Sequence, residues 1–125
     1  MPTFVGFDHV QLDMPEGAQD RARAFYCQVL GMQEPPKPAR LRQAAVWCRL
    51  GSVELHLSAE PVAVTSQSAH PGIRVQGLRE LADQCEAAGY QPRFDDRYPG
   101  RRRFYMEDPF GNRLEFLELD EAGDA

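Results

Sequence analysis

The feature that most constrains this chain is an internal repeat in the order of its predicted elements. Alternating polarity predicts strands, and apolar residues at helical spacing that stop at a glycine predict helices. In the first half these patterns predict a strand, a helix and a two-stranded hairpin at residues 7–14, 20–30, 43–50 and 52–58. In the second half they predict a short strand, a helix and two closing strands at residues 70–76, 78–88, 101–107 and 112–119. The repeat predicts an α+β fold in which helices cover one face of each small sheet.

The length of 125 residues suits one compact domain made of these two modules. The modules are expected at about residues 4–58 and 70–119, joined by the polar linker 59–69. Prolines at 35–38 predict an edge or a connection, because proline has no N–H to donate to a sheet. Asp108-Pro109-Phe110-Gly111 predicts a tight turn, and the tail after Leu119 is expected to fray.

Composition excludes several classes of partner. A net charge of −5 and a pI near 5.1 argue against binding to a nucleic-acid backbone. No apolar run approaches the roughly 20 residues that span a bilayer, and the start of the chain lacks a signal-peptide pattern, so we expect a cytoplasmic protein without a membrane partner. Three cysteines without CxxC spacing predict buried reduced thiols: Cys27, Cys48 and Cys85.

Two chemically matched pairs of residues follow the repeat. His9 and His70 are 61 positions apart, and Glu54 and Glu115 are separated by the same 61 positions. Period-two alternation puts all four on strand faces opposite those expected to meet the helices, so they converge if the halves face each other. A single such residue is usually solvated, but the matched spacing in a chain with 3 histidines favours joint ligation. Two imidazoles and two carboxylates suit a divalent Ni, Zn, Mn, Fe or Co ion.

Further polar residues are candidates for contact with a substrate. His56 shares a strand face with Glu54, so it either orients or replaces a ligand, contacts substrate, or is an ordinary half-exposed histidine. Candidates for binding an anionic substrate alternate along second-half strands, with solvated arginine as the competing interpretation: Arg74, Arg101, Arg103 and Tyr105. Aromatic residues predicted to be core are Trp47, Phe104, Phe110 and Phe116.

Five segments together resemble signatures of the vicinal oxygen chelate superfamily of glyoxalases, bleomycin-resistance proteins and extradiol dioxygenases: FDHVQL, ARAFYCQVLGM, GSVELHL, AHPGIRV and RRFYMEDPFGNRLEFLE. The resemblance covers Phe7 to Leu119. It implies two tandem βαβββ modules that form a cupped mixed sheet with helices on the outer face. It also implies that His9, Glu54, His70 and Glu115 fill the four metal-ligand positions. Pro71 and Gly72 depart from an unbroken strand and predict His70 at a strand start or sheet edge.

The resemblance implies a metal-dependent lyase or isomerase of the glyoxalase type, with a small-molecule substrate that carries adjacent oxygens. Proton abstraction by Glu115 or Glu54 would give an enolate that the ion stabilises. A homodimer is the usual assembly in such proteins. Two alternatives remain open. One is an Fe(II) or Mn(II) extradiol-type dioxygenase in which Glu54 is not a ligand, and the other is a metal-free binding protein of the bleomycin-resistance kind.

Overall fold

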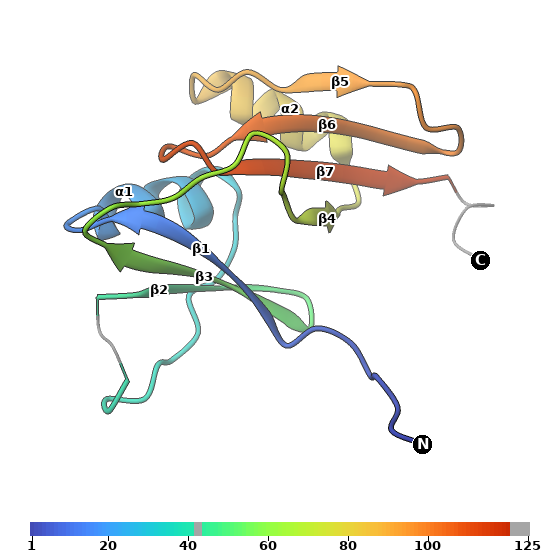
Figure 1. Cartoon of the computed structure of the whole chain (residues 1–125). Helices are drawn as coiled ribbons and strands as arrows, with labels where there is room; N and C mark the ends of the chain where they lie inside the picture. The colour runs from blue at the N-terminus through green and yellow to red at the C-terminus, as the bar shows by residue number, and fades with distance from the viewer. Residues whose placement is uncertain (42–43, 121–125) are drawn as a thin grey trace. The chain divides into compact units, whose positions relative to one another are not determined.

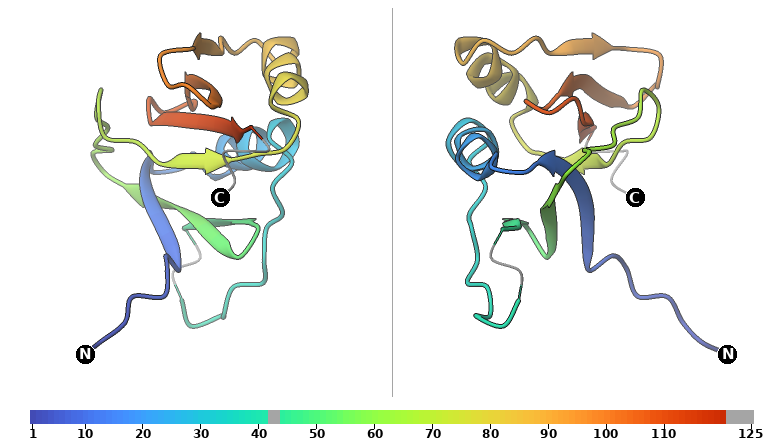
Figure 2. Two further views of the ribbon diagram at one scale, coloured as in Figure 1. Left: turned by 90° about the vertical axis from the view of Figure 1, so that its right-hand side faces the viewer. Right: turned by 60° about the vertical axis from the view of Figure 1, so that its left-hand side comes forward.

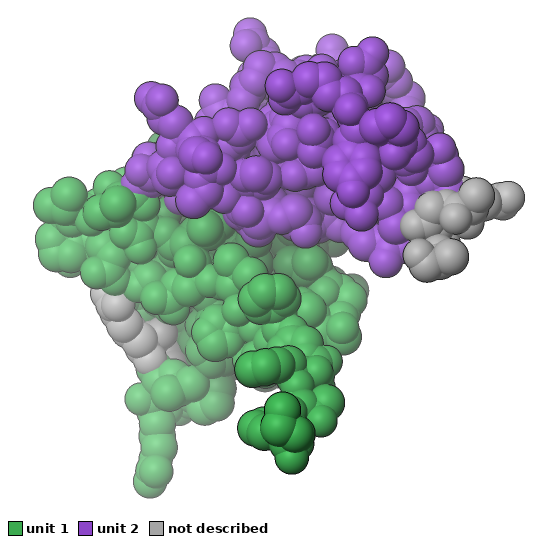
Figure 3. All heavy atoms as spheres, turned by 45° about the vertical axis from the view of Figure 1, so that its right-hand side comes forward, with its two compact units in different colours: residues 1–64 green, residues 65–125 purple. Residues whose placement is uncertain are grey.

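The computed structural model describes residues 1–41 and 44–120, which form two compact units (Figures 1 and 3). Unit 1 is Met1–Val64 and unit 2 is Thr65–Ala125. The predicted first residue of the hairpin, Gln43, and the predicted frayed tail from residue 121 onward lie outside the described residues. Each unit has its own sheet, its own helix and its own buried core.

Unit 1 contains a three-stranded mixed sheet. Its elements in chain order are β1 (His9–Pro15), α1 (Gln19–Arg23), η1 (Ala24–Val29), β2 (Val46–Leu50) and β3 (Val53–Glu60). The strand order is β1-β3-β2, with β1 parallel and β2 antiparallel to the central β3 (Figures 1 and 2). The hairpin of β2 and β3 turns at Gly51, whose φ of 56° suits a glycine.

The predicted helix at 20–30 forms, but its second half is a π-helix. α1 runs into η1, where Leu30 N donates to Phe25 O at 2.9 Å, a bond that spans five residues. The consecutive residues Phe25 and Tyr26 are both buried there. Apolar spacing predicted a helix correctly, but it does not distinguish a π-turn from an α-turn.

The proline-rich segment acts as the predicted edge. Gln33 makes an isolated antiparallel bridge to Arg49, and Arg49 N donates to Gln33 O at 2.7 Å. Pro35, Pro36 and Pro38 follow immediately and cannot continue a ladder. The second strand of the first module is therefore reduced to this one bridge.

Unit 2 has a four-stranded sheet. Its elements are β4 (Gly72–Arg74), α2 (Leu78–Ala87), β5 (Arg93–Asp95), β6 (Arg101–Glu107) and β7 (Arg113–Leu119). The strand order is β4-β7-β6-β5, and β4 is the strand parallel to its neighbour. α2 packs against β6 and β7 (Figure 1). The short strand β5 was not predicted as an element, because three residues show too little periodicity.

The α+β class with two βαβββ modules is confirmed. Apolar residues from the helix and the sheet form the core of each unit, with Phe25, Tyr26 and Leu57 in unit 1 and Phe104 and Phe116 in unit 2. All three cysteines are free; Cys48 and Cys85 are buried as predicted, whereas Cys27 is half-buried. Within the described residues, no helix is both long enough and apolar enough to span a bilayer.

Side chains fix the turns and the start of α2. The carboxylate of buried Asp108 accepts hydrogen bonds from Phe110 N at 2.9 Å and Asn112 N at 2.8 Å, which confirms the predicted turn. Glu118 on β7 accepts from Leu78 N at 3.1 Å and Gly77 N at 3.3 Å. A strand residue therefore caps the helix, since Gly77 has no side chain to do so.

Candidate functional site

A group of charged and ring side chains surrounds Glu54 in unit 1; we call it the unit-1 cluster (His9, Trp47, Arg49, Glu54 and His56). Strand register builds it, because Glu54 on β3 pairs with His9 on β1 and with Arg49 on β2. Glu54 Oε1 lies 2.9 Å from His56 Nε2, and Oε2 lies 3.6 Å from an Arg49 nitrogen. The Glu54 side chain is 28% exposed, so it is held by His56 and Arg49 and is still open to a ligand.

The ring of His56 lies between two other rings. Its centroid is 4.4 Å from that of His9 and 4.4 Å from that of Trp47, with interplanar angles of 14° and 7°. His9 Nδ1 is 2.8 Å from Asp8 Oδ1. A carboxylate on one ring nitrogen orients an imidazole and leaves the other nitrogen for a ligand. The stack on His56 and the contact of Nδ1 with Asp8 orient the His9 ring, and its Nε2 atom is the one left for a ligand.

The unit-2 cluster (His70, Asp95, Arg103, Tyr105 and Glu115) is centred on a nearly buried carboxylate. The Glu115 side chain is 10% exposed; its Oε1 lies 2.9 Å from His70 Nε2 and its Oε2 lies 3.4 Å from Arg103 Nη1. Tyr105, the register partner of Glu115 on β6, meets the His70 ring edge to face at 5.3 Å. Arg103 supplies the positive charge that a buried carboxylate requires.

Asp95 joins the unit-2 cluster to the loop after β5. Both of its oxygens lie 3.0 Å from Arg97 Nε, and Oδ2 also lies 3.4 Å from Arg103 Nη2. Hydrogen bonds from the Arg97 side chain and backbone, with the charge of Arg103, hold the pKa of Asp95 well below its usual range. Asp95 therefore stays ionised, and its hydrogen bonds to Arg97 are shorter than its contact with Arg103.

The chemistry of His70 and Glu115 fits a divalent cation. His70 Nδ1 lies 2.7 Å from the carbonyl oxygen of Ser68, which only accepts, so Nδ1 carries the proton. In the neutral ring, the Nε2 lone pair then faces a carboxylate oxygen at 2.9 Å, and a proton or a cation must neutralise the pair. Two ligands with bonds of about 2.1 Å at right angles lie roughly 3 Å apart, which matches this separation. Among the described residues, no group of three or more His, Cys, Asp or Glu could hold a metal ion.

Comparison with known proteins identifies the family. The family model described as the Glyoxalase/Bleomycin resistance protein/Dioxygenase superfamily matches residues 6–116. The chain belongs to this superfamily. No protein in the search of curated proteins matches it.

Three solved structures have folds similar to that of this chain. A glyoxalase family protein from Bacillus anthracis is 37% identical, with a TM-score of 0.90, and the match covers 96% of this chain and 100% of that one. A lactoylglutathione lyase from Agrobacterium tumefaciens is 21% identical over 93% of this chain and 95% of its own, with a TM-score of 0.72. A fosfomycin resistance protein from Listeria monocytogenes, in complex with Mn(II) and 1S,2S-dihydroxypropylphosphonic acid, is 13% identical, covering 98% of each chain, with a TM-score of 0.79. The last two show a shared fold only.

Within this superfamily member, the predicted site residues fall into separate groups. Glu54 and His56 are hydrogen-bonded in unit 1, and His9 stacks on His56. His70, Glu115, Arg103 and Tyr105 are brought together in unit 2. Arg74, in contrast, is exposed at the far end of β4, paired in register with Leu117.

The equal 61-residue spacing does not correspond to equal places in the two sheets. Glu54 pairs with His9, whereas Glu115 pairs with Gly72, two positions after His70. The expectation that His70 lies at a strand start is close, because β4 begins at Gly72 and His70 precedes it. Pro71 provides the reason, since its missing N–H cannot join a ladder at that point. The His70 side chain reaches Glu115 from outside the strand.

Several residues of the clusters were missed or misread from sequence. Trp47 was predicted to be core and is half-exposed, lying flat on His56; this prediction is wrong. Phe104 and Phe116 are buried as predicted, whereas Phe110 is only half-buried. The tight turn at Gly51 is the signal that could have found Trp47, because hairpin register opposes Trp47 to His56. Nothing local marks Asp95 or Arg97, because the three-residue strand β5, which ends at Asp95, is too short to predict.

Proposed function

We propose that the protein is a divalent-metal-dependent enzyme of the glyoxalase type that acts on a small substrate with adjacent oxygens. The observation that carries the proposal is the pair of His70 Nε2 and Glu115 Oε1, 2.9 Å apart, with the His70 proton held on the opposite nitrogen by Ser68. The Nε2 lone pair and the carboxylate oxygen both carry electron density, so a cation bound by both would stabilise this arrangement. Membership in the superfamily supports the same chemistry.

The proposed ligands are His9, Glu54, His70 and Glu115, one imidazole and one carboxylate from each unit. His56 is the alternative imidazole in unit 1, since its Nε2 already contacts Glu54. The two modules would serve one site either within a chain or between two copies in a homodimer. A bound Ni, Zn, Mn, Fe or Co ion supplies Lewis-acid chemistry, which polarises a substrate carbonyl and makes the adjacent C–H bond more acidic.

The residues of the chain would move the proton. Glu115 or Glu54, released from the metal, is the candidate base, because a free carboxylate next to the reacting carbon would accept its proton. Arg103, 3.4 Å from Glu115, would hold the carboxylate in place and contact an anionic part of the substrate. Tyr105 and His56 line the two clusters and are proposed to contact substrate, and Arg74 would do so from the end of β4.

The test is metal content, measured by mass spectrometry on protein purified without chelators or an affinity tag. The parent is compared with His9→Ala and Glu115→Ala, with Glu107→Ala as a control because Glu107 is exposed and bound to Arg93. We expect near-stoichiometric metal in the parent and the control and none in the two site variants, each shown to be folded by circular dichroism. Metal retained in both site variants would refute the ligand set.

One observation favours a second function, an extradiol-type dioxygenase with a His, His and Glu triad. Glu54 contacts His56 at 2.9 Å rather than the proposed ligand His9, whereas Glu115 contacts the proposed ligand His70 at 2.9 Å, so Glu54 is the proposed ligand most readily left out. Oxygen uptake with catechols in the presence of Fe(II) or Mn(II) would favour this function. Metal-dependent turnover of hemithioacetals or acyl-CoA epimers without oxygen uptake would favour the first.

A further inference from the structure

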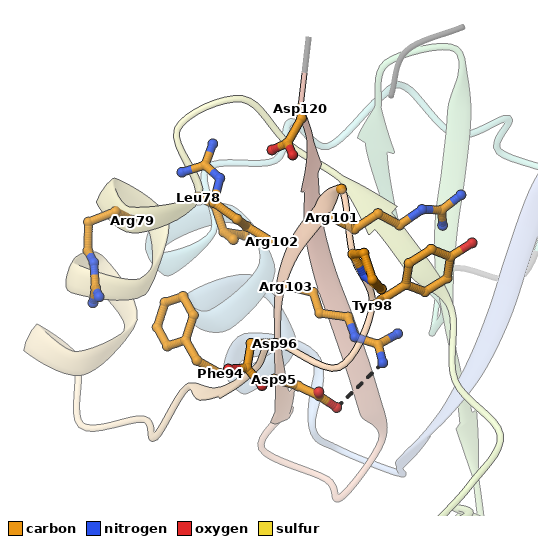
Figure 4. Close-up of a pocket in the computed structure, with 12 residues that line it drawn as sticks. Leu78, Arg79, Phe94, Asp95, Asp96, Tyr98, Arg101, Arg102, Arg103 and Asp120 are labelled. Atoms are coloured by element: carbon orange, nitrogen blue, oxygen red, sulfur yellow. Dashed lines mark hydrogen bonds and ion pairs between the residues drawn. The ribbon is translucent and has the colours of Figure 1, made fainter. Parts of the chain in front are cut away.

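A hollow of about 570 Å³ in unit 2 begins beside the unit-2 cluster. It lies around the loop that joins β5 to β6, and Arg103 belongs both to its wall and to the cluster. Figure 4 shows Tyr98, Arg101 and Arg103 on one side of β6, with Phe94 and Arg102 on the other. Strand alternation explains this division, because Arg101, Arg103 and Tyr105 share the sheet face of Glu115.

Arg103 has donor capacity that the described residues do not use. Its contacts to Asp95 and Glu115 are both long, at 3.4 Å, and its Nε is buried without a hydrogen-bond partner among the residues that the structure describes. Arg97 makes the shorter hydrogen bonds to Asp95, with its Nε 3.0 Å from each carboxylate oxygen. A guanidinium has five N–H donors in a fixed fork, so the terminal nitrogens of Arg103 remain able to bind an oxyanion.

Arg101 adds a second positive charge on the same face. Its guanidinium lies 4.4 Å from the ring centroid of Tyr98, and that of Arg103 lies 5.7 Å from the same ring. Within residues 1–41 and 44–120, Arg101 forms no ion pair, and the residue Tyr98 is 45% exposed. Two guanidinium groups beside one ring repel each other, and an oxyanion between them would attract both and so outweigh this repulsion.

We propose that this hollow binds the anionic group of a small molecule, a phosphate or a carboxylate, through Arg101 and Arg103, with Tyr98 as its apolar wall. The inference rests on the proposed function only in taking this molecule to be the substrate. Arg103 Nη1 lies 3.4 Å from Oε2 of Glu115, a candidate base. The substrate class is therefore small molecules in which the oxyanion lies within a few bonds of the reacting carbon.

The test measures binding to metal-free protein by isothermal titration calorimetry. The probes are phenyl phosphate, phenylacetate and the uncharged benzyl alcohol. We expect the parent to bind at least one of the two anions and not the alcohol, and the anion that binds identifies the oxyanion as phosphate or carboxylate. Arg101→Gln should weaken this binding about ten-fold or more, the usual effect of losing a hydrogen bond to a charged group.

Arg103→Lys should also weaken binding, because lysine keeps the charge but loses the fork. Arg93→Gln is the matched control: it removes an exposed arginine of the same sheet that pairs with Glu107 outside the hollow, and it should bind like the parent. No anion binding by the parent, or unchanged binding in both hollow variants, would overturn the inference. Metal content of the same preparations tests the proposed function separately, and Arg101→Gln should leave it at the parent's level.

Discussion

At the scale of single residues, burial separates the three thiols. Burial raises the pKa of Cys48 to about 12 and that of Cys85 to about 11, whereas Cys27 is only half-buried. At pH 8 the Cys48 thiol is therefore almost entirely protonated, and the thiolate is the reactive form. We expect iodoacetamide to label Cys27 first in the folded protein, with Cys48 and Cys85 protected until denaturant is added, as peptide mass spectrometry would measure. Equal labelling of all three thiols in the native protein would contradict this.

Trp47 offers a direct probe of the unit-1 cluster, because it is the single tryptophan of the chain and stacks on His56. An ion taken up at Glu54 would change the hydrogen bond between Glu54 and His56, and with it the surroundings of the indole ring. We expect added divalent metal to change tryptophan fluorescence in the parent and in Glu107→Gln, and not in Glu54→Gln. A fluorescence change of equal size in Glu54→Gln would mean that the ion binds elsewhere.

The sequence alone predicted the residue types of the clusters better than their partners. His9, Glu54, His70 and Glu115 stand out because repeat spacing and strand alternation are local patterns. The bond from His56 to Glu54 and the contact of Arg103 with Glu115 depend on rotamers and on cross-strand register, which a pattern of polarity does not contain. For this reason His56 and Arg103 appeared only among several candidates.

At the scale of elements, Glu118 ties the start of α2 to β7. Backbone N–H groups of Leu78 and Gly77 stabilise its charged form and lower its pKa below the usual range. A carboxyl whose pKa is lowered by folding stabilises the protein above its unfolded pKa of about 4.3, and that stabilisation is lost as pH falls through the folded value. Glu118→Gln should therefore lower the melting temperature at pH 7, and the difference from the parent should narrow in acid.

Thermal unfolding followed by circular dichroism from pH 7 downward would measure this. Glu86→Gln is the control, since Glu86 is an exposed residue near the other end of α2 and caps nothing with its side chain. Its melting temperature should stay at or above that of the parent across the range. A Glu118→Gln curve parallel to the parent at every pH would show that the ionised carboxylate does not hold the helix.

The limits of sequence reading at this scale also have physical causes. Long periodic segments such as β6 were predicted with the observed bounds, whereas β5 has three residues and was not seen. The register of β4 differs from that of β1, because Glu115 pairs with Gly72 and accordingly donates from its N–H to the carbonyl oxygen of Pro71 at 3.1 Å. Equal spacing along the chain correctly predicted that the two halves are equivalent. It missed that the strand position of His9 in unit 1 corresponds to Gly72 in unit 2, two residues after His70.

At the scale of the whole molecule, the repeat means that each unit carries one imidazole and carboxylate pair at 2.9 Å, His56 with Glu54 and His70 with Glu115. Each pair also has an arginine beside its carboxylate, Arg49 in unit 1 and Arg103 in unit 2. Within the described residues neither unit assembles three metal-ligating side chains by itself. The proposed metal-dependent function accordingly takes its ligands from both units.

That dependence predicts how metal affects stability. An ion that binds only the folded chain adds about 2.7 kcal/mol to the free energy of unfolding when it is present at 100 times its Kd. Urea unfolding with added metal and with chelator should show such a gain in the parent, and both His9→Ala in unit 1 and His70→Ala in unit 2 should lose most of it. If one variant kept the full gain, the ion would be held by the other unit alone, and a single shared centre would be ruled out.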